Sequence, residues 1–372
     1  MNRLGGPPDQ ATEPELPHSV SGVLALRSNG LQPKSDGLAM ASNLRAMASN
    51  LRAMASNLRA MASNLLVLRG VLEISPHSFT ASGLTTITLP ETTESIGDSA
   101  FEACRSLSEV RMSDCVSEIG EGAFAACSAL VSLKLSRSVM KIGGSAFAGC
   151  SALSSLSIPD SVIHLGPSAL ENCTSLGRLT LPDSMVFISP STFAGCTSLL
   201  SLTIPDSVLE LGESAFEGCI ALTDVRIPRH VREIEESVFA GCRALKSLTI
   251  PNSVSRIGVS AFAGCSSLTN LTLPNSITEI QTAAFAGCTS LTTLTIPDAV
   301  VKLGTSAFAG CSALTTLTIS SPATRIGLAA FAGCSALGSL SIPKPPTQID
   351  PSAFAGCPSL CLAALLDGST ER

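Results

Sequence analysis

Apolar and polar residues follow one pattern that repeats every 23 residues through most of the chain. When each unit is counted from a leucine, twelve full units run from Leu84 to Ser359. Position 1 is Leu in every unit, position 13 is Ile or Leu, and position 18 is Phe in eleven units, with Leu170 as the exception. Self-similarity at a fixed period of this size predicts stacked repeats that form a solenoid.

Each unit contains the signals of a strand followed by turns. Positions 4 and 6 are apolar and alternate with mostly polar residues at 3 and 5, which is the period of a half-buried strand. Pro at position 7 in nine units ends the strand, and the Asp, Asn or Ser that usually follows favours a turn. Position 20 is Gly in nine units and Asn172 in a tenth, which indicates a positive φ. Ala at 17 and Phe at 18 indicate a short helical turn that packs inward.

A single unit cannot bury its own apolar side. Stacked neighbours form ladders of Leu, Ile, Phe and Cys, and these ladders together make one continuous core. The predicted fold class is therefore an α/β solenoid, in which strands alternate with short helical or irregular turns.

The repeat, written LxxLxIPxSVxxIGxxAFxGCxS, resembles the BspA-like leucine-rich repeats, which are also described as the Treponema type. The resemblance covers about three quarters of the chain. It implies a right-handed superhelix with a parallel sheet on the concave side and the turns on the convex side. It also implies kinship with microbial proteins that often act in adhesion or interaction at the cell surface.

The segments outside the full units differ in composition from the array. The first 37 residues are rich in Pro, Gly and Ser, which predicts disorder. The next segment contains AMASNLR heptads, whose Leu and Met spacing mimics a coiled-coil seam, although Ser-Asn in every heptad disfavours a helix. We interpret the heptads as duplicated low-complexity sequence; a helix-mediated dimer and an organelle transit segment are the alternatives. The predicted organisation is a disordered tail (1–37), the heptad segment (38–70), a solenoid (71–365) and a C-terminal tail (366–372). Within the solenoid, we expect a cap (74–83), twelve full units (84–359) and a partial unit (360–365).

The ends of the chain bear on partners and on location. The partial unit leaves a sheet edge with little cover, so self-association through the C-terminal end is possible. The N-terminus lacks a convincing secretory signal, and no stretch is long and apolar enough to span a membrane. We expect a cytoplasmic protein. A cell-surface location would require a different N-terminus, and an organellar one would require translation to begin at an internal Met.

Twelve of the fourteen cysteines recur at position 21. Disulfides would join these cysteines in pairs, whereas the repeat gives all twelve the same surroundings. A zinc site is not indicated, because the sequence contains no CxxC pair. We favour buried structural thiols, and expect Cys115 and Cys361, which lie off the ladder, to be more reactive. The ladder consists of Cys104, Cys127, Cys150, Cys173, Cys196, Cys219, Cys242, Cys265, Cys288, Cys311, Cys334 and Cys357.

The remaining residues offer little chemistry. None of the four histidines has a metal-ligand companion at helical or strand spacing, and no nucleophile has a base beside it in the pattern. We therefore expect no enzyme activity, no catalytic residue, no metal and no cofactor. The net charge of −6 and the absence of a basic stripe argue against nucleic acid as a partner.

Positions 2, 3 and 5 face away from the core on the strand side, and most of them are Ser or Thr. Charged exceptions cluster in units 2 to 5 and in units 7 and 8. Two interpretations are open: they are scattered solvating charges, or they form the footprint of a protein partner on the concave face. The footprint comprises Glu109, Arg111, Lys134, Arg178, Asp224, Arg226 and Lys246.

These features favour a non-enzymatic scaffold that binds proteins through a Ser/Thr-rich concave face. Because the chain contains no Trp or Tyr, such contacts would be broad and polar. A cell-surface adhesion or structural protein is the second hypothesis. Ice binding by regular Thr pairs, such as Thr293 and Thr295, is a remote third, because ice requires a flat face.

Overall fold

A computed structural model describes residues 66–67, 70–321, 324–342, 346 and 348–360. The chain divides into two compact units, Met1–Met47 and Ala48–Arg372, and all described residues belong to the second. Several predicted segments lie outside the described residues. They are the N-terminal tail, nearly all of the heptad segment, the C-terminal tail and all but the first residue of the partial unit.

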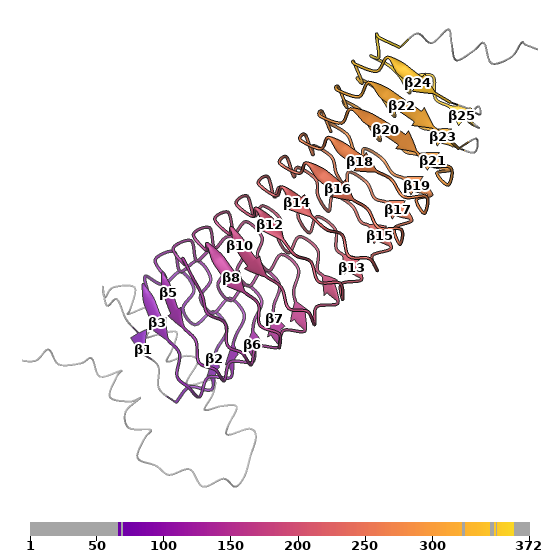
Figure 1. The fold of residues 1–372 in the computed structure, drawn as a ribbon. Helices are drawn as coiled ribbons and strands as arrows, with labels where there is room; N and C mark the ends of the chain where they lie inside the picture. Colours follow the sequence, from indigo (N-terminus) through magenta and orange to yellow (C-terminus); the bar gives the residue numbers. More distant parts are fainter. Residues whose placement is uncertain (1–65, 68–69, 322–323, 343–345, 347, 361–372) are drawn as a thin grey trace, which may run out of the picture. The chain divides into compact units, whose positions relative to one another are not determined.

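Each repeat unit forms one coil, and the coils stack with their strands parallel (Figure 1). We number the coils 1 to 12 from the unit that begins at Leu84. A first stack of strands forms at positions 3 to 5. Its strands are β1 (Leu66–Val67), β3 (Thr86–Thr88), β5 (Glu109–Arg111), β8 (Ser155–Ser157), β10 (Arg178–Thr180), β12 (Ser201–Leu202), β14 (Asp224–Val225), β16 (Ser247–Thr249), β18 (Asn270–Thr272), β20 (Thr293–Ile296), β22 (Thr316–Ile319) and β24 (Ser339–Ser341).

A second stack of two-residue strands forms at positions 12 and 13 of the coils. Pairing in both stacks joins residues 23 apart in nearly all coils, as in Glu233 with Arg256, so the sequence period is the structural register. The strands are β2 (Glu73–Ile74), β4 (Ser95–Ile96), β6 (Glu118–Ile119), β7 (Lys141–Ile142), β9 (His164–Leu165), β11 (Phe187–Ile188), β13 (Glu210–Leu211), β15 (Glu233–Ile234), β17 (Arg256–Ile257), β19 (Glu279–Ile280), β21 (Lys302–Leu303), β23 (Arg325–Ile326) and β25 (Gln348–Ile349).

The first strand of each coil has the predicted half-buried alternation. In β8, Leu156 is buried while Ser155 and Ser157 are exposed. The two-residue strands of the second stack show the same alternation, because the residue at position 13 points into the core and the residue at position 12 points outward. Outward side chains at positions 3, 5 and 12 are therefore free to differ between coils without disturbing the core.

The return segment of each coil consists of turns, and the described residues contain no helix. In coil 8, the amides of Ser260, Phe262 and Gly264 donate to carbonyls of coil 9 at 2.7–2.9 Å, while those of Ala261 and Ala263 bond three residues back. Positive φ values at Ser260 (54°) and Gly264 (73°) interrupt any right-handed helix. The helical turn expected around Phe at position 18 is thus corrected to a hydrogen-bonded stack of turns.

Positive φ occurs at two positions of the return segment. Position 20 was predicted, and Gly, Asn172 and even Ala103 adopt it there. Position 16, which is usually Ser, has φ values of 50–57° in most coils and was not anticipated, because Ser gives no strong signal for this conformation.

Stacked phenylalanine rings fill the centre of the return side. Neighbouring rings lie with centroids 5.1–5.6 Å apart and nearly parallel planes in most pairs. The stack is interrupted only in coil 4, where buried Leu170 replaces Phe. At the N-terminal end, Phe79 of the cap stacks on Phe101 at 5.2 Å, and Ser82 lies 3.1 Å from the Cys104 thiol. The cap therefore continues the core with a shortened sequence.

The twelve ladder cysteines are buried, and none of them forms a disulfide. Each thiol donates to the carbonyl of position 18 in the preceding coil or cap at 2.9–3.4 Å, as Cys265 does to Phe239. Burial raises the pKa of the Cys150, Cys196 and Cys265 thiols to about 12. The described part of the chain contains no group of three or more side chains placed to hold a metal ion. The ladder is thus a core position with a weak hydrogen bond.

The phenylalanine stack gives a direct stability prediction. Phe239 is fully buried between Phe216 and Phe262, so we expect Phe239→Ala to lower the free energy of unfolding by about 3–5 kcal/mol. Phe187 is 42% exposed, and Phe187→Ala serves as the control, with an expected loss below about 1 kcal/mol. Urea unfolding followed by circular dichroism measures both, and equal losses would contradict the assigned packing.

The thiols give a second prediction. In a Cys361→Ser background, we expect one thiol of the native protein to react rapidly with Ellman's reagent, and Cys115→Ser to abolish that reaction, because Cys115 is exposed and off the ladder. The ladder thiols should react only after unfolding in guanidinium, since burial keeps them out of reach of the reagent. Rapid reaction of several thiols in the native state would refute their burial.

Candidate interaction surface

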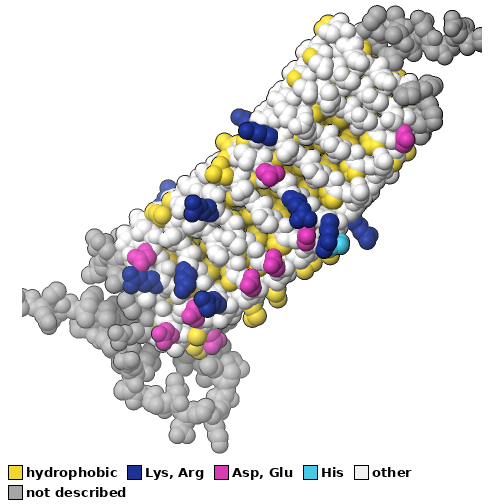
Figure 2. All heavy atoms as spheres, viewed as in Figure 1, with side chains coloured by type: hydrophobic (Ala, Val, Ile, Leu, Met, Phe, Trp, Pro, Cys, Tyr) yellow, Lys and Arg dark blue, Asp and Glu magenta, His cyan; other side chains and the backbone are white. Residues whose placement is uncertain are grey.

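The seven predicted footprint residues are all exposed on the outer face of the first stack. Glu109 and Arg111 lie in β5, Arg178 lies in β10 and Asp224 lies in β14. Arg226 directly follows β14, Lys246 directly precedes β16, and Lys134 occupies position 5 of coil 3. Figure 2 shows Lys and Arg side chains (dark blue) over the N-terminal and middle coils, whereas the C-terminal coils carry few charges. The difference agrees with the Ser and Thr residues that the repeat places there, including Thr293, which pairs with Thr316.

Two of the predicted residues meet at one hollow. Lys134 of coil 3 and Arg178 of coil 5 both line a depression of about 550 Å³, together with Arg137. We call it the cationic hollow. None of these three cations makes an ion pair within the described residues, and no acidic side chain lines the hollow. Its other polar lining residues carry hydroxyl groups, namely Ser132, Ser155, Ser157 and Thr180.

Two other predicted cations are already paired. Arg111 Nε donates to Glu109 Oε1 at 2.7 Å within β5. Arg226 lies 3.4 Å from Asp206 Oδ1, an oxygen that accepts no hydrogen bond. These pairs lower the net charge offered at each position, so Arg111 and Arg226 are weaker candidates for binding an anionic partner than Lys134 and Arg178. Asp224 and Lys246 make no ion pair with described residues but lie outside the hollow.

A row of charges on the second stack was not anticipated. Position 12 carries opposite charges in neighbouring coils: Lys141 Nζ contacts Glu118 at 2.6 Å, and Lys302 Nζ contacts Glu279 at 2.5 Å. The signal was present in the sequence, because oppositely charged residues occur 23 apart at this position in several coils, but it emerges only once position 12 is known to face outward. These pairs link neighbouring coils at the surface, where exposed ion pairs contribute little to stability.

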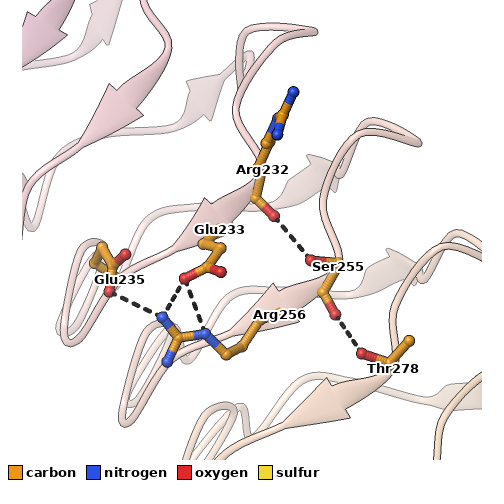
Figure 3. A network of polar contacts seen from close by, with 6 residues as sticks. All are labelled: Arg232, Glu233, Glu235, Ser255, Arg256 and Thr278. Atoms are coloured by element: carbon orange, nitrogen blue, oxygen red, sulfur yellow. Dashed lines mark hydrogen bonds and ion pairs between the residues drawn. The ribbon is translucent and has the colours of Figure 1, made fainter.

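Arg256 forms the largest cluster of this row (Figure 3). Its guanidinium donates twice to Glu233 and lies 3.7 Å from Glu235. The hydrogen bond that Arg256 donates to Glu233 is the main cause of a raised pKa for Arg256, whereas partial burial raises the pKa of Glu235. Arg232 takes part only through its carbonyl, which accepts from Ser255, and its guanidinium extends away from the cluster.

A second hollow, of about 800 Å³, lies beside this cluster. Its charges are mixed, because Arg229, His230 and Arg232 line it together with glutamates of coils 6 and 7. The hydroxyl of Ser253 is buried there without a hydrogen-bond partner, although serines at the equivalent position of several other coils donate to the preceding coil. The sequence showed only that His230, like the other histidines, has no metal-ligand companion in the pattern, and this grouping was missed because it depends on three stacked coils.

No helix among the described residues has the length and hydropathy needed to cross a bilayer.

Comparisons with known proteins place the chain among repeat proteins. No curated protein shows significant sequence similarity to the chain. A leucine-rich repeat protein from Bacteroides ovatus is 27% identical, with a TM-score of 0.72 over 80% of this chain and 85% of that one. A leucine rich cell surface protein from Faecalibacterium prausnitzii is 30% identical, with a TM-score of 0.54 over 76% of this chain and 88% of that one.

The family model described as "BspA type Leucine rich repeat region (6 copies)" matches four overlapping segments, 62–177, 117–246, 164–282 and 232–361. Together these matches span both strand stacks and every full coil. The period, the parallel stacking and the solved relatives agree with this match. The chain therefore belongs to the BspA-type leucine-rich repeat family.

Proposed function

We propose that the chain is a non-enzymatic scaffold that binds an acidic segment of a protein partner on the first-stack face. The observation that carries the proposal is the cationic hollow, where Lys134, Arg137 and Arg178 converge without any acidic side chain in the lining. The chain as a whole has a net charge of −6, so this concentration of positive charge is a local exception. A negatively charged partner supplies the missing counter-charge.

The chemistry of the hollow fits carboxylates. Arg binds a carboxylate through two parallel hydrogen bonds, and the lining hydroxyls of Ser155 and Thr180 add donors that adapt to the partner. Leu133, Leu156 and Pro159 give the hollow an apolar floor for the aliphatic part of a Glu or Asp side chain. Burial raises the pKa of the Cys150 and Cys265 thiols and makes them poor nucleophiles, which supports a binding role over a catalytic one.

The test is a double charge reversal. The unsubstituted chain is used for proximity labelling in native cells, and the affinity of each enriched protein is then measured by calorimetry. We expect Lys134→Glu with Arg178→Glu to weaken binding at least about tenfold, and added salt to weaken binding by the unsubstituted chain.

Arg243→Glu with Arg325→Glu is the matched control, because it makes the same charge change at exposed residues outside the hollow. Equal loss in both double variants would point to bulk charge and contradict the proposed site. Undiminished binding by the first double variant would also reject it.

A cell-surface adhesion or structural protein is the second candidate function. The observation that favours it is the name of the Faecalibacterium prausnitzii relative, a leucine rich cell surface protein at 30% identity. The free thiols fit a reducing compartment instead, which supports the cytoplasm. Localisation of the tagged full chain separates the two, since a cytosolic signal favours the scaffold and a surface signal favours the adhesin.

A further inference from the structure

The three cations of the cationic hollow come from two coils that are separated by a third. Lys134 and Arg137 belong to coil 3, and Arg178 belongs to coil 5. Coil 4 lies between them in register and presents only the short, exposed side chains of Ser155 and Ser157. Two strand spacings and two residues along the strand separate Lys134 from Arg178, so their Cα atoms lie roughly 12 Å apart. Both side chains are long enough to reach one group that is bound over coil 4.

The charge of the hollow exceeds what a single carboxylate supplies. None of its three cations makes an ion pair with a described residue, and hydroxyl groups are the only other polar side chains in the lining. One carboxylate has two oxygens and binds one Arg through paired hydrogen bonds, which leaves two cations without a counter-charge. A phosphate monoester carries a charge of about −1.5 to −2 at neutral pH and has three acceptor oxygens. A phosphate group therefore matches the hollow better in charge and in number of acceptors.

Aspartates at position 8 limit how far the positive surface extends. Arg137 occupies this position in coil 3, whereas coils 2, 4 and 5 have the exposed Asp114, Asp160 and Asp183. None of these aspartates lines the hollow or makes an ion pair with a described residue. A run of Glu or Asp side chains would bring some of its charges close to them and be repelled. One compact dianion keeps its charge among the cations, so the surrounding aspartates favour it.

We propose that the acidic segment bound at the cationic hollow carries a phosphorylated Ser or Thr, whose phosphate group lies over coil 4 between the cations of coils 3 and 5. This inference rests on the proposed function and names the chemical group that the hollow recognises. Arg137 and Arg178 donate to the phosphate oxygens through their guanidinium groups, and Lys134 adds a compact positive charge. Clusters of Arg are a recurring means of recognising phosphorylated segments of proteins.

The hollow suits the phosphates of a nucleic acid less well. A polynucleotide is held by cations that follow its backbone and by aromatic side chains on which its bases stack. The cations of the hollow are confined to coils 3 and 5, and its lining contains no aromatic residue. A phosphorylated segment of a protein presents one phosphate group on an extended chain, which agrees with a single cationic site.

Calorimetry with matched synthetic peptides tests the proposal on the full chain. The probes are short acetylated and amidated peptides of Ala and Gly that differ only at their centre, which is phosphoserine, Ser or Glu-Glu. The Glu-Glu peptide carries nearly the same charge as the phosphoserine peptide but spreads it over two side chains. We expect the phosphoserine peptide to bind at least about tenfold more tightly than the Glu-Glu peptide, and the Ser peptide to show no measurable binding.

A pair of substitutions tests the place of binding. Ser157→Asp puts a negative charge at the centre of the hollow, and we expect it to weaken binding of the phosphoserine peptide at least about tenfold. Ser341→Asp is the matched control, because it makes the same change at position 5 of coil 12, which is exposed and outside the hollow. The control should bind the phosphoserine peptide like the unsubstituted chain, and circular dichroism would verify that both variants fold.

The pH dependence of binding gives a second measurement. Phosphoserine takes up a proton with a pKa of about 6, so its charge falls as the pH drops from about 7.5 to about 5.5, whereas Glu keeps its charge over this range. The preference for phosphoserine over Glu-Glu should therefore fall about two- to fourfold. The lining contains no His, and any titration of the nearby Asp114, Asp160 and Asp183 acts on both peptides, so the ratio of the two affinities reports on the phosphate.

Failure of this inference can be distinguished from failure of the proposed function. If the Glu-Glu peptide binds as tightly as the phosphoserine peptide and Ser157→Asp weakens both, phosphate recognition is wrong while the hollow still binds acidic segments. Phosphoserine binding that Ser157→Asp leaves intact overturns the assigned place. Binding of none of the peptides overturns the inference, and the double charge reversal then decides the proposed function. A thymidine oligonucleotide that displaces the phosphoserine peptide at a lower concentration of phosphate groups would assign the hollow to nucleic acid and overturn the inference.

Discussion

The stack depends on hydrogen bonds that pass from each return segment to the next coil. Residues at positions 16, 18 and 20 donate across the gap, and left-handed backbone at Ser260 and Gly264 turns alternate amides toward the neighbour. Each coil therefore satisfies its backbone only when another coil lies beside it. This requirement fixes the 23-residue register, and the phenylalanine and cysteine ladders follow from it because equivalent residues are brought into contact.

The same constraint separates residues that the core dictates from residues that it leaves free. Positions 3, 5 and 12 point outward, as does position 11 in most coils, so differences among coils at these positions cost little stability. Coils 3 to 8 carry most of the exceptions: the cationic hollow, the exposed apolar side chains of Met140, Ile163, Val186 and Leu209, and the Arg256 cluster between neighbouring coils. The C-terminal coils remain close to the repeat pattern. Interaction surfaces are thus expected where the pattern is broken.

Much of the fold could be predicted from periodicity alone. The strand at positions 3 to 5, the positive φ at position 20 and the burial of Cys265 and its equivalents all follow from residue type at a fixed place in the period. The return segment was expected to contain a helical turn, because Ala and Phe resemble helix formers and nothing in a single unit shows that its amides bond to the next coil. The sequence showed which footprint residues carry a charge and of which sign. It did not show that Lys134 and Arg178 line the same hollow, because they come from different coils. Nor did it show that Arg111 pairs with Glu109 of the same strand.

Hydrogen exchange of individual amides measures the inter-coil bonds most directly. The amides of Phe239, Phe262 and Phe285 should exchange slowly, at rates set by opening of the stack, because each donates to the following coil. The amides of exposed position 2 residues such as Lys246 and Thr269 donate to the preceding coil at the start of the first-stack strand. These amides should exchange faster than the phenylalanine amides. Rapid exchange at the three phenylalanine amides in the native protein would contradict a fold held together by these bonds.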